Sequence, residues 1–287
     1  QVLFDLDLKI AALVSGALGV IIFSFKSASK LMDKLTQVLG AMMILLIGYV
    51  AFSTNPPVGT AIKETFLPSS INLMAIITLI GGTVGGYIMF SGGHRLIDAG
   101  IVGEENLPQV NKSAILGMSV ATIVRIFLFL AVLGVVSLGN QLDAGNPAAD
   151  AFKIAAGTVG YKIFGLVFLA AALTSIVGAA YTSVSFLKTL FKVVKDNENL
   201  FIIGFIVVST LILIFLGKPV KLLVLAGSLN GLILPITLAI TLIASKKEGI
   251  VGKYKHSNIL FLLGWVVVVV TAYIGVQSLS KLAELFA

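Results

Sequence analysis

The sequence lacks cysteine entirely and contains only two histidines among its 287 residues. Without cysteine, disulfides, thiolate metal sites and cysteine nucleophiles are excluded. The histidines, His94 and His256, lie far apart in the chain, and no HExxH, GxSxG or P-loop motif is present. We therefore expect no enzymatic centre and no resident cofactor.

Charge is also scarce, at 11% of residues against roughly 25% in a soluble domain. Hydrophobic residues make up 58% of the chain, and the mean hydropathy is +1.08. The apolar residues form runs longer than the ~18 residues that indicate a membrane span. Because hydrocarbon offers the backbone no hydrogen-bond partners, such runs must be helices. The sequence therefore predicts an all-α integral membrane protein.

We expect eight membrane-spanning segments joined by connections shorter than about 25 residues, so that residues 1–287 form a single transmembrane domain. The segments are residues 8–25, 36–53, 71–93, 113–139, 158–187, 201–217, 219–245 and 258–280. The connection at 140–157 contains a short helix that begins after Asn146-Pro147. The lipid bilayer is therefore the first expected partner of the chain.

The formal net charge of +7 reflects topology rather than nucleic-acid binding. Twelve lysines and arginines fall in the loops after the first, third, fifth and seventh segments, seven on the other side, and Arg125 within the fourth segment. The positive-inside rule makes the loops with twelve cytoplasmic. Both ends then lie outside, and the first residue is Gln1. We therefore expect the chain to be the C-terminal part of a larger protein, with an odd number of helices before it.

The third segment is rich in glycine at its centre. Gly81, Gly82, Gly85 and Gly86 occur within six residues, and each costs a helix roughly 1 kcal/mol relative to alanine. The cluster predicts a break within 81–86. An unwound backbone at this depth must line a cavity or contact protein, and transporters use such breaks to bind ions and substrates. The alternative is close helix packing, because Gly81 with Gly85, and Gly82 with Gly86, have the small-xxx-small spacing.

Polar residues elsewhere admit a functional or a structural interpretation. Arg125 is a cation near the centre of the fourth segment, where it has either a functional role or a structural ion pair. Asn230 opens the run 230–235, which ends in Pro235 and predicts a second helix break. Its amide is expected to bind an ion or to satisfy the freed backbone. The fifth segment carries several hydroxyls, for which hydrogen bonding to their own helix is favoured over ion binding.

Three charged or titratable side chains follow the glycine-rich segment at its cytoplasmic end. These are His94, Arg95 and Asp98. They are candidates for a gate, although an interfacial charge cluster is the simpler interpretation.

Three runs resemble helices of the NRAMP-type divalent metal transporters, and most closely a divergent, NRAMP-related bacterial branch. Residues 78–100 resemble the sixth helix of that family, residues 172–181 the eighth, and residues 226–235 the tenth. The resemblance covers essentially the whole chain as helices four to eleven. It implies a multi-pass protein of the bacterial cell membrane with part of the leucine-transporter fold, which consists of two inverted five-helix repeats.

The resemblance also implies a function and a site. The function is secondary transport of divalent cations by alternating access, with the cation as substrate. The metal would lie between the unwound middles of helices one and six, and the first-helix Asp and Asn ligands would belong to three helices absent from this chain. The substrate or ion-binding positions that it implies are Gly82, Thr83, Gly85, Gly86, Tyr87 and Asn230, and the metal positions among them are Gly82, Gly85, Tyr87 and Asn230.

The sequence departs from the Ala-x-x-Met-Pro-His run usual in that family. Aligned on Thr-Val, the methionine position is Gly85 and the histidine position is Tyr87. A thioether favours softer transition metals, so its loss predicts Mg²⁺ as a substrate alongside Mn²⁺. Replacement of histidine by tyrosine weakens the case for proton coupling. Two other functions stay open, namely an amino-acid or organic-solute permease of the same fold, and a non-transporting membrane scaffold.

Overall fold

The computed structural model describes residues 2–85 and 87–284, and within these ranges all regular secondary structure is helical. The chain divides into two compact units. The first comprises Gln1–Ser69, Leu107–Val184 and Phe191–Lys218, and the second comprises Ser70–Asn106, Ser185–Leu190 and Pro219–Ala287. The boundary at Ser185 divides α7 (Pro147–Leu190) between them.

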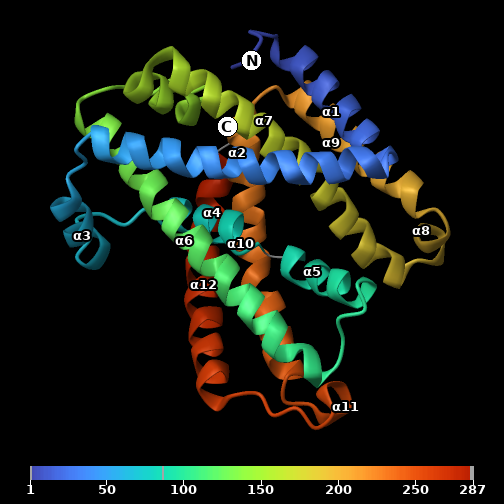
Figure 1. Cartoon of the computed structure of the whole chain (residues 1–287). Helices are drawn as coiled ribbons and strands as arrows, with labels where there is room; N and C mark the ends of the chain where they lie inside the picture. The colour runs from blue at the N-terminus through green and yellow to red at the C-terminus, as the bar shows by residue number, and fades with distance from the viewer. Residues whose placement is uncertain (1, 86, 285–287) are drawn as a thin grey trace. The chain divides into compact units, whose positions relative to one another are not determined.

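The first unit contains α1 (Leu8–Ser24), α2 (Lys26–Ser53), α3 (Val58–Phe66), α6 (Leu107–Ser137), most of α7, α8 (Lys192–Asp196) and α9 (Glu198–Leu216). Helix α1 packs along α9, and α2 crosses α6 (Figure 1). Its core joins Val50 of α2, Ala131 of α6, and Phe152 and Phe164 of α7, all at most 3% exposed. The rings of Phe152 and Phe164 stack with centroids 4.8 Å apart. Apolar side chains from three helices therefore hold this unit together.

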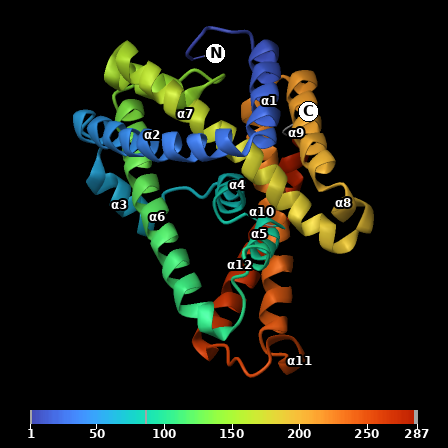
Figure 2. The same ribbon diagram turned by 45° about the vertical axis from the view of Figure 1, so that its right-hand side comes forward.

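The second unit contains α4 (Leu73–Thr83), α5 (Tyr87–Asp98), the 3₁₀ turn η1 (Glu104–Asn106), the last turns of α7, α10 (Pro219–Ala244), α11 (Glu248–Val251) and α12 (Asn258–Glu284). Helix α10 packs against both α4 and α12, as both views show (Figure 2). This unit carries the glycine-rich segment.

Five helices among the described residues are long and apolar enough to cross a membrane. They are Glu104–Ser137, Pro147–Leu190, Glu198–Leu216, Pro219–Ala244 and Asn258–Ser278. A sixth span is present if Gln37–Ser53 of α2 and Val58–Phe66 of α3, which are bent by 101° relative to each other, count as one. The remaining apolar helices, α1 and α4, are shorter. An all-helical membrane protein is thus confirmed, whereas eight spans and the inverted repeat stay predictions.

Several segment boundaries differ from the expected ones. Helix α2 begins at Lys26, so the residues expected to form a loop up to residue 35 are helical, and α3 occupies the middle of the loop expected at 54–70. The short helix after Asn146 is confirmed, since the Asn146 side chain accepts a hydrogen bond from the Ala149 amide at 3.3 Å. Gly157, at φ 63°, separates this helix from the long part of α7.

Candidate functional site

The glycine-rich segment is broken where the sequence predicts. Helix α4 ends at Thr83, and the Val84 amide donates the last hydrogen bond to the Ile80 carbonyl at 2.8 Å. Gly85 has φ 74°, in the left-handed region, and α5 begins at Tyr87. An L-residue with a Cβ pays about 1–2 kcal/mol for this conformation, whereas glycine adopts it freely. The break within 81–86 is therefore confirmed.

Helix α4 is well defined up to this break. Its N-cap residue is Asn72, whose side chain accepts a hydrogen bond from the Ala75 amide at 3.0 Å. Thr83, in the last turn, directs its hydroxyl to the Ile80 carbonyl at 3.2 Å. The last carbonyls of a helix have no partner in that helix, and they form the negative end of its dipole. The end of α4 is thus suited to a cation.

Helices α4 and α10 cross with their backbones in contact. A Cβ added to Gly81 would overlap the carbonyl oxygen of Gly227 and the amide nitrogen of Gly231. A Cβ on Gly227 would lie 2.8 Å from the carbonyl oxygen of Thr78. Gly82, by contrast, is exposed, and an added Cβ would have no neighbour within 4 Å. The cluster therefore combines a helix break at Gly85 with close packing at Gly81, whereas packing through Gly82 is not found and the role of the break in binding stays a prediction.

Two hydroxyls join the same helices beside this crossing. Thr78 Oγ1 and Ser228 Oγ are 2.8 Å apart, and Ser228 is 1% exposed. The Met74 carbonyl lies 2.7 Å from Thr78 Oγ1 and the Val224 carbonyl 2.8 Å from Ser228 Oγ, so one hydroxyl donates to its own helix while the other donates across to its partner. The pair was not predicted, although Ser228 lies in the run that resembles the tenth helix. Interhelical hydroxyl contacts of this kind stabilise membrane helix pairs.

The second predicted helix break is wrong. Helix α10 runs without interruption from Pro219 to Ala244, with Pro235 inside it. A proline ring clashes with the residue four positions before it, which here is Gly231, buried against the Ile77 carbonyl of α4. Neighbouring helices commonly support proline in membrane helices. Asn230 is therefore a half-buried residue within a regular helix, next to the contact with α4.

The predicted site residues lie in different settings. Gly82 and Thr83 are exposed in the last turn of α4, and Gly85 is half-buried at the break. Gly86 lies outside the described residues. Tyr87 is the first residue of α5. No group of three or more His, Asp or Glu that could hold a metal ion occurs in the part of the chain that the structure describes.

The polar group at the end of α5 includes an ion pair. The carboxylate of Asp98 accepts hydrogen bonds from Ser185 Oγ at 2.8 Å and from Lys188 Nζ at 3.0 Å, both on the last turns of α7. The ring of His94 contacts that of Phe186, with centroids 5.5 Å apart. Asp98 and Lys188 keep 28% and 19% of their side chains exposed, so the pair contributes about 1 kcal/mol or less. This favours the charge-cluster interpretation for Asp98. Arg95 is exposed on the same helix.

Arg125 and the hydroxyls of the fifth segment belong to other surroundings. Arg125 is exposed on α6, in the first unit, and no hydrogen bond or ion pair of its side chain is found within residues 2–85 and 87–284. The hydroxyls of Thr174, Thr182 and Ser183 bond to carbonyls of α7 three or four residues earlier. The structural interpretation is therefore confirmed for these three.

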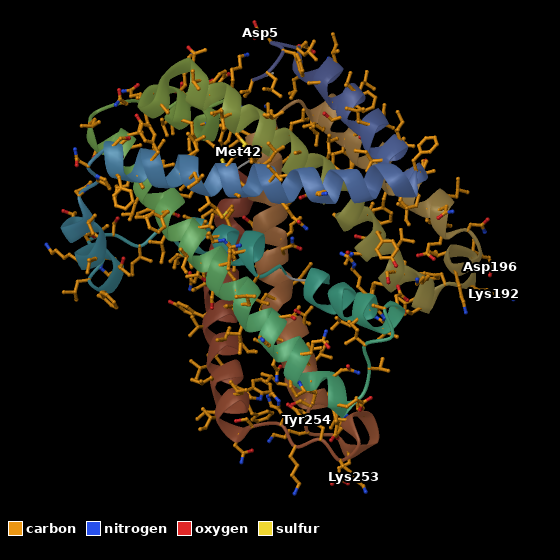
Figure 3. The ribbon with its side chains drawn as sticks, in the orientation of Figure 1. Asp5, Met42, Lys192, Asp196, Lys253 and Tyr254 are labelled. Atoms are coloured by element: carbon orange, nitrogen blue, oxygen red, sulfur yellow. The ribbon has the colours of Figure 1, made fainter. Side chains whose placement is uncertain are left out.

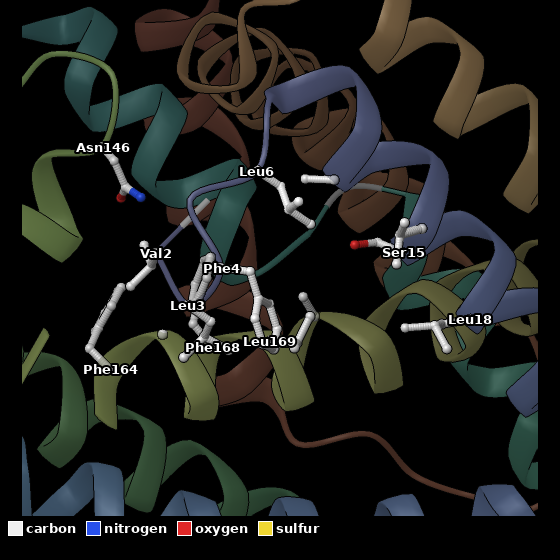
Figure 4. Close-up of a pocket in the computed structure, with 14 residues that line it drawn as sticks. Val2, Leu3, Phe4, Leu6, Ser15, Leu18, Asn146, Phe164, Phe168 and Leu169 are labelled. Atoms are coloured by element: carbon white, nitrogen blue, oxygen red, sulfur yellow. The ribbon is translucent and has the colours of Figure 1, made fainter. Parts of the chain in front are cut away.

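The first unit contains a separate cavity of about 270 Å³ (Figure 4). Val2, Leu3 and Phe4 line it together with side chains of α1 and α7, and none of its fourteen lining residues is charged. Lys162 fixes the N-terminal segment beside it by donating to the carbonyls of Val2 and Leu3 at 2.7 and 2.9 Å. An apolar cavity of this kind does not suit a metal ion.

Comparison with known proteins identifies the family of the chain. Residues 1–281 match the family model for natural resistance-associated macrophage protein-like (Nramp) proteins. The chain is 54% identical over 288 residues to the uncharacterized membrane protein YcsG of Bacillus subtilis, covering 100% of this chain and 71% of that protein. It is 47% identical over 286 residues to an uncharacterized membrane protein of Haemophilus influenzae, covering 99% and 72%. No solved structure matches the chain.

Proposed function

Because the chain belongs to the Nramp family, we propose that it transports divalent metal cations, Mg²⁺ as well as Mn²⁺, across the cell membrane by alternating access. The observation that carries the proposal is the helix break at Gly85. Broken helices in transporters present backbone groups and helix-dipole ends to the transported ion. The cation is the substrate, and the protein needs no resident metal.

The carbonyl end of α4 supplies the attraction for the cation. Gly82 and Thr83 lie in its last turn, where the carbonyls have no partner within the helix and the negative end of the helix dipole lies. Carbonyl oxygens are hard ligands of the kind that Mg²⁺ and Mn²⁺ accept. Asn230, beside the crossing of α10 with α4, offers a further amide oxygen. The first-helix Asp and Asn ligands implied by the family stay a prediction.

Gly85 determines selectivity in this proposal. A thioether at this position would add affinity for softer transition ions that Mg²⁺ cannot match. Glycine removes that advantage and leaves space for the water molecules that Mg²⁺ retains. The expected result is a transporter in which Mg²⁺ competes effectively with Mn²⁺.

The test is uptake of Mn²⁺ into liposomes by the intact transporter, measured against increasing Mg²⁺ for the wild type and for Gly85→Met. We expect Mg²⁺ to inhibit wild-type uptake and to inhibit Gly85→Met less. Wild-type uptake that ignores a hundredfold excess of Mg²⁺ would contradict the hard-ion proposal while leaving metal transport intact. Uptake of an amino acid without uptake of either cation would instead favour the permease.

The identity of Tyr87 affects whether protons are expected to be transported together with the cation. Histidine, the side chain that titrates near neutral pH, is usual at this position in the family and is replaced here by Tyr87. We therefore propose that cation uptake proceeds without proton transport through this residue. Acidification inside the liposomes that accompanies Mn²⁺ uptake and disappears in Tyr87→Phe would overturn this part of the proposal.

A further inference from the structure

The connection between α10 and α12 carries a concentration of positive charge. Residues 245–257 contain four lysines and one histidine but only one acidic residue, Glu248. Helices α10 and α12 pack side by side and are both long and apolar enough to cross a membrane. A short connection between two adjacent spans lies at the depth of the lipid headgroups. The charge is therefore held where phosphate groups are concentrated.

Lys246 differs from the other three lysines because it is engaged inside the loop. Its Nζ donates to the carbonyl of His256 at 3.1 Å and to Asn258 Oδ1 at 2.7 Å. It also lies 5.0 Å from the centroid of the Phe261 ring. These contacts connect the end of α10 to the start of α12 and fix the shape of the loop.

The remaining lysines face outward. Lys247, Lys253 and Lys255 are exposed, and none of their ammonium groups has a hydrogen-bond or ion-pair partner among the described residues. Figure 3 shows Lys253 in this loop, next to Tyr254. Three exposed cations on one short loop, with no ion-pair partner among the described residues, are complementary to an anionic surface.

Apolar side chains accompany these cations. Ile250, on the single turn of α11, is 65% exposed, and Tyr254 is 37% exposed. An exposed isoleucine is unfavourable in water but favourable at the boundary between headgroups and acyl chains, where tyrosine is also enriched. A soluble anionic partner would leave Ile250 in water, whereas a phospholipid accounts for the charge and for the apolar surface together.

We propose that residues 245–257 bind anionic phospholipids of the leaflet that they face. Lys247, Lys253 and Lys255 contact the phosphates, Ile250 enters the acyl boundary, and Lys246 holds the loop in the binding shape. Each lysine near an anionic surface contributes about a fivefold preference for charged over neutral lipid. The proposal concerns the loop alone and is independent of the transported substrate.

The single tryptophan of the chain provides the measurement. Trp265 lies on α12 seven residues after Asn258, or about 10 Å along the helix from the loop. The chain is placed in phosphatidylcholine vesicles containing a fixed fraction of either brominated phosphatidylglycerol or brominated phosphatidylcholine. Bromine quenches the fluorescence of nearby tryptophan. We expect severalfold stronger quenching by the anionic lipid, and equal quenching by both lipids for the triple variant Lys247→Gln, Lys253→Gln, Lys255→Gln.

A second triple variant is the matched control. Lys9→Gln, Lys63→Gln and Lys218→Gln remove the same charge from exposed positions outside the loop. This variant is expected to keep the wild-type preference, as is the wild type in excess inorganic phosphate at constant ionic strength. Equal quenching of the wild type by both lipids would overturn the proposal, and so would loss of preference in the control variant. Displacement by inorganic phosphate would show binding of a free anion instead of a lipid.

A further measurement needs no variant. The anionic preference of the wild type is expected to fall as salt rises from 0.1 to 1 M, because the Debye length falls from about 10 to about 3 Å. A preference unchanged over this range would exclude an electrostatic contact with the lysines. Ile250→Ser is expected to lower quenching by both lipids equally, since it removes the apolar contact and no charge.

Discussion

Two segments of the second unit both contain helix-breaking residues, yet only one of them is broken. The segment at 81–86 combines glycines with no proline and is interrupted, whereas the run 230–235 combines Gly231 with Pro235 and stays helical. Gly85 is in the left-handed conformation, but Gly231 is an ordinary helical residue in contact with α4. A glycine therefore interrupts a helix where its backbone adopts a left-handed conformation. It lets two helices pack closely where a neighbouring helix occupies the space that a side chain would take.

The largest expected effect comes from adding a methyl group at the contact between α4 and α10. Gly81→Ala places a methyl group on the backbone of Gly227 and Gly231, which cannot move aside as a flexible side chain would. We expect a loss of about 1–3 kcal/mol or more of unfolding free energy, the cost typical of overpacking. Thermal or denaturant unfolding in detergent, monitored by circular dichroism, measures the effect.

Gly82→Ala is the matched control for this prediction. It adds the same methyl group one residue later, at an exposed position with no atom within 4 Å of the new Cβ. It should leave stability unchanged or raise it slightly, since alanine favours helix more than glycine does. Equal stability of the two variants would contradict the close contact at Gly81.

The next effect concerns the break itself. Gly85→Ala places a Cβ on a residue with φ 74°, at a cost of about 1–2 kcal/mol. Gly217, which ends α9 with φ 62°, carries the same cost in the first unit, where an added Cβ has open space. We expect Gly85→Ala and Gly217→Ala to destabilise the protein to a similar degree.

Cation uptake should separate these two variants. At matched amounts of folded protein in liposomes, Gly85→Ala is expected to lower Mn²⁺ uptake severalfold, because it restricts the backbone that we propose contacts the ion. Gly217→Ala should retain uptake. A similar loss in both variants would mean that stability, and not the break, governs transport.

The sequence predicted the class of the fold and the position of the break because both depend on local composition. Long apolar runs leave helices as the only solution in lipid, and four glycines within six residues weaken one place more than any other. It could not assign separate roles to Gly81 and Gly85, because the contact with α10 joins residues about 150 positions apart, as Thr78 and Ser228 show. Spacing within one helix does not reveal which face meets a partner.

Two other features could not be predicted from the sequence, one for a local reason and one because it depends on a tertiary contact. The start of α2 at Lys26 was missed because a charged, serine-containing stretch resembles a loop, although the chain turns at Phe25 alone. The bond from Asp98 to Ser185 and Lys188 depends on how α5 and the end of α7 meet. For the candidate site, the sequence located the helix break at Gly85, whereas the ligand roles of the predicted positions stay predictions, since side-chain ligands depend on tertiary contacts that local patterns do not contain.

A smaller effect is expected at the hydroxyl pair beside Gly81. Thr78→Val and Ser228→Ala each remove one partner of the 2.8 Å contact, and the double variant removes both. The backbone carbonyls of Met74 and Val224 compete for the same two hydroxyl protons, so the coupling energy should be about 0.6 kcal/mol, the average for such membrane contacts. A double-mutant cycle of unfolding free energies measures it, and a coupling of zero would show that the glycines alone hold α4 to α10.

The smallest effect on stability and uptake is expected at Pro235. This position tests most directly whether α10 differs from the broken segment. Pro235→Ala restores a backbone amide in a helix that is already continuous, so stability should be unchanged or slightly higher. Cation uptake should stay within about twofold of the wild type, because no unwound backbone at this position takes part in binding. Asn230→Leu, five residues earlier, is the contrasting variant, since it removes an amide oxygen while leaving the helix intact. If Pro235→Ala abolished uptake without loss of folded protein, α10 would have to open at Pro235 during transport, and the break predicted from the sequence would belong to another state of the cycle.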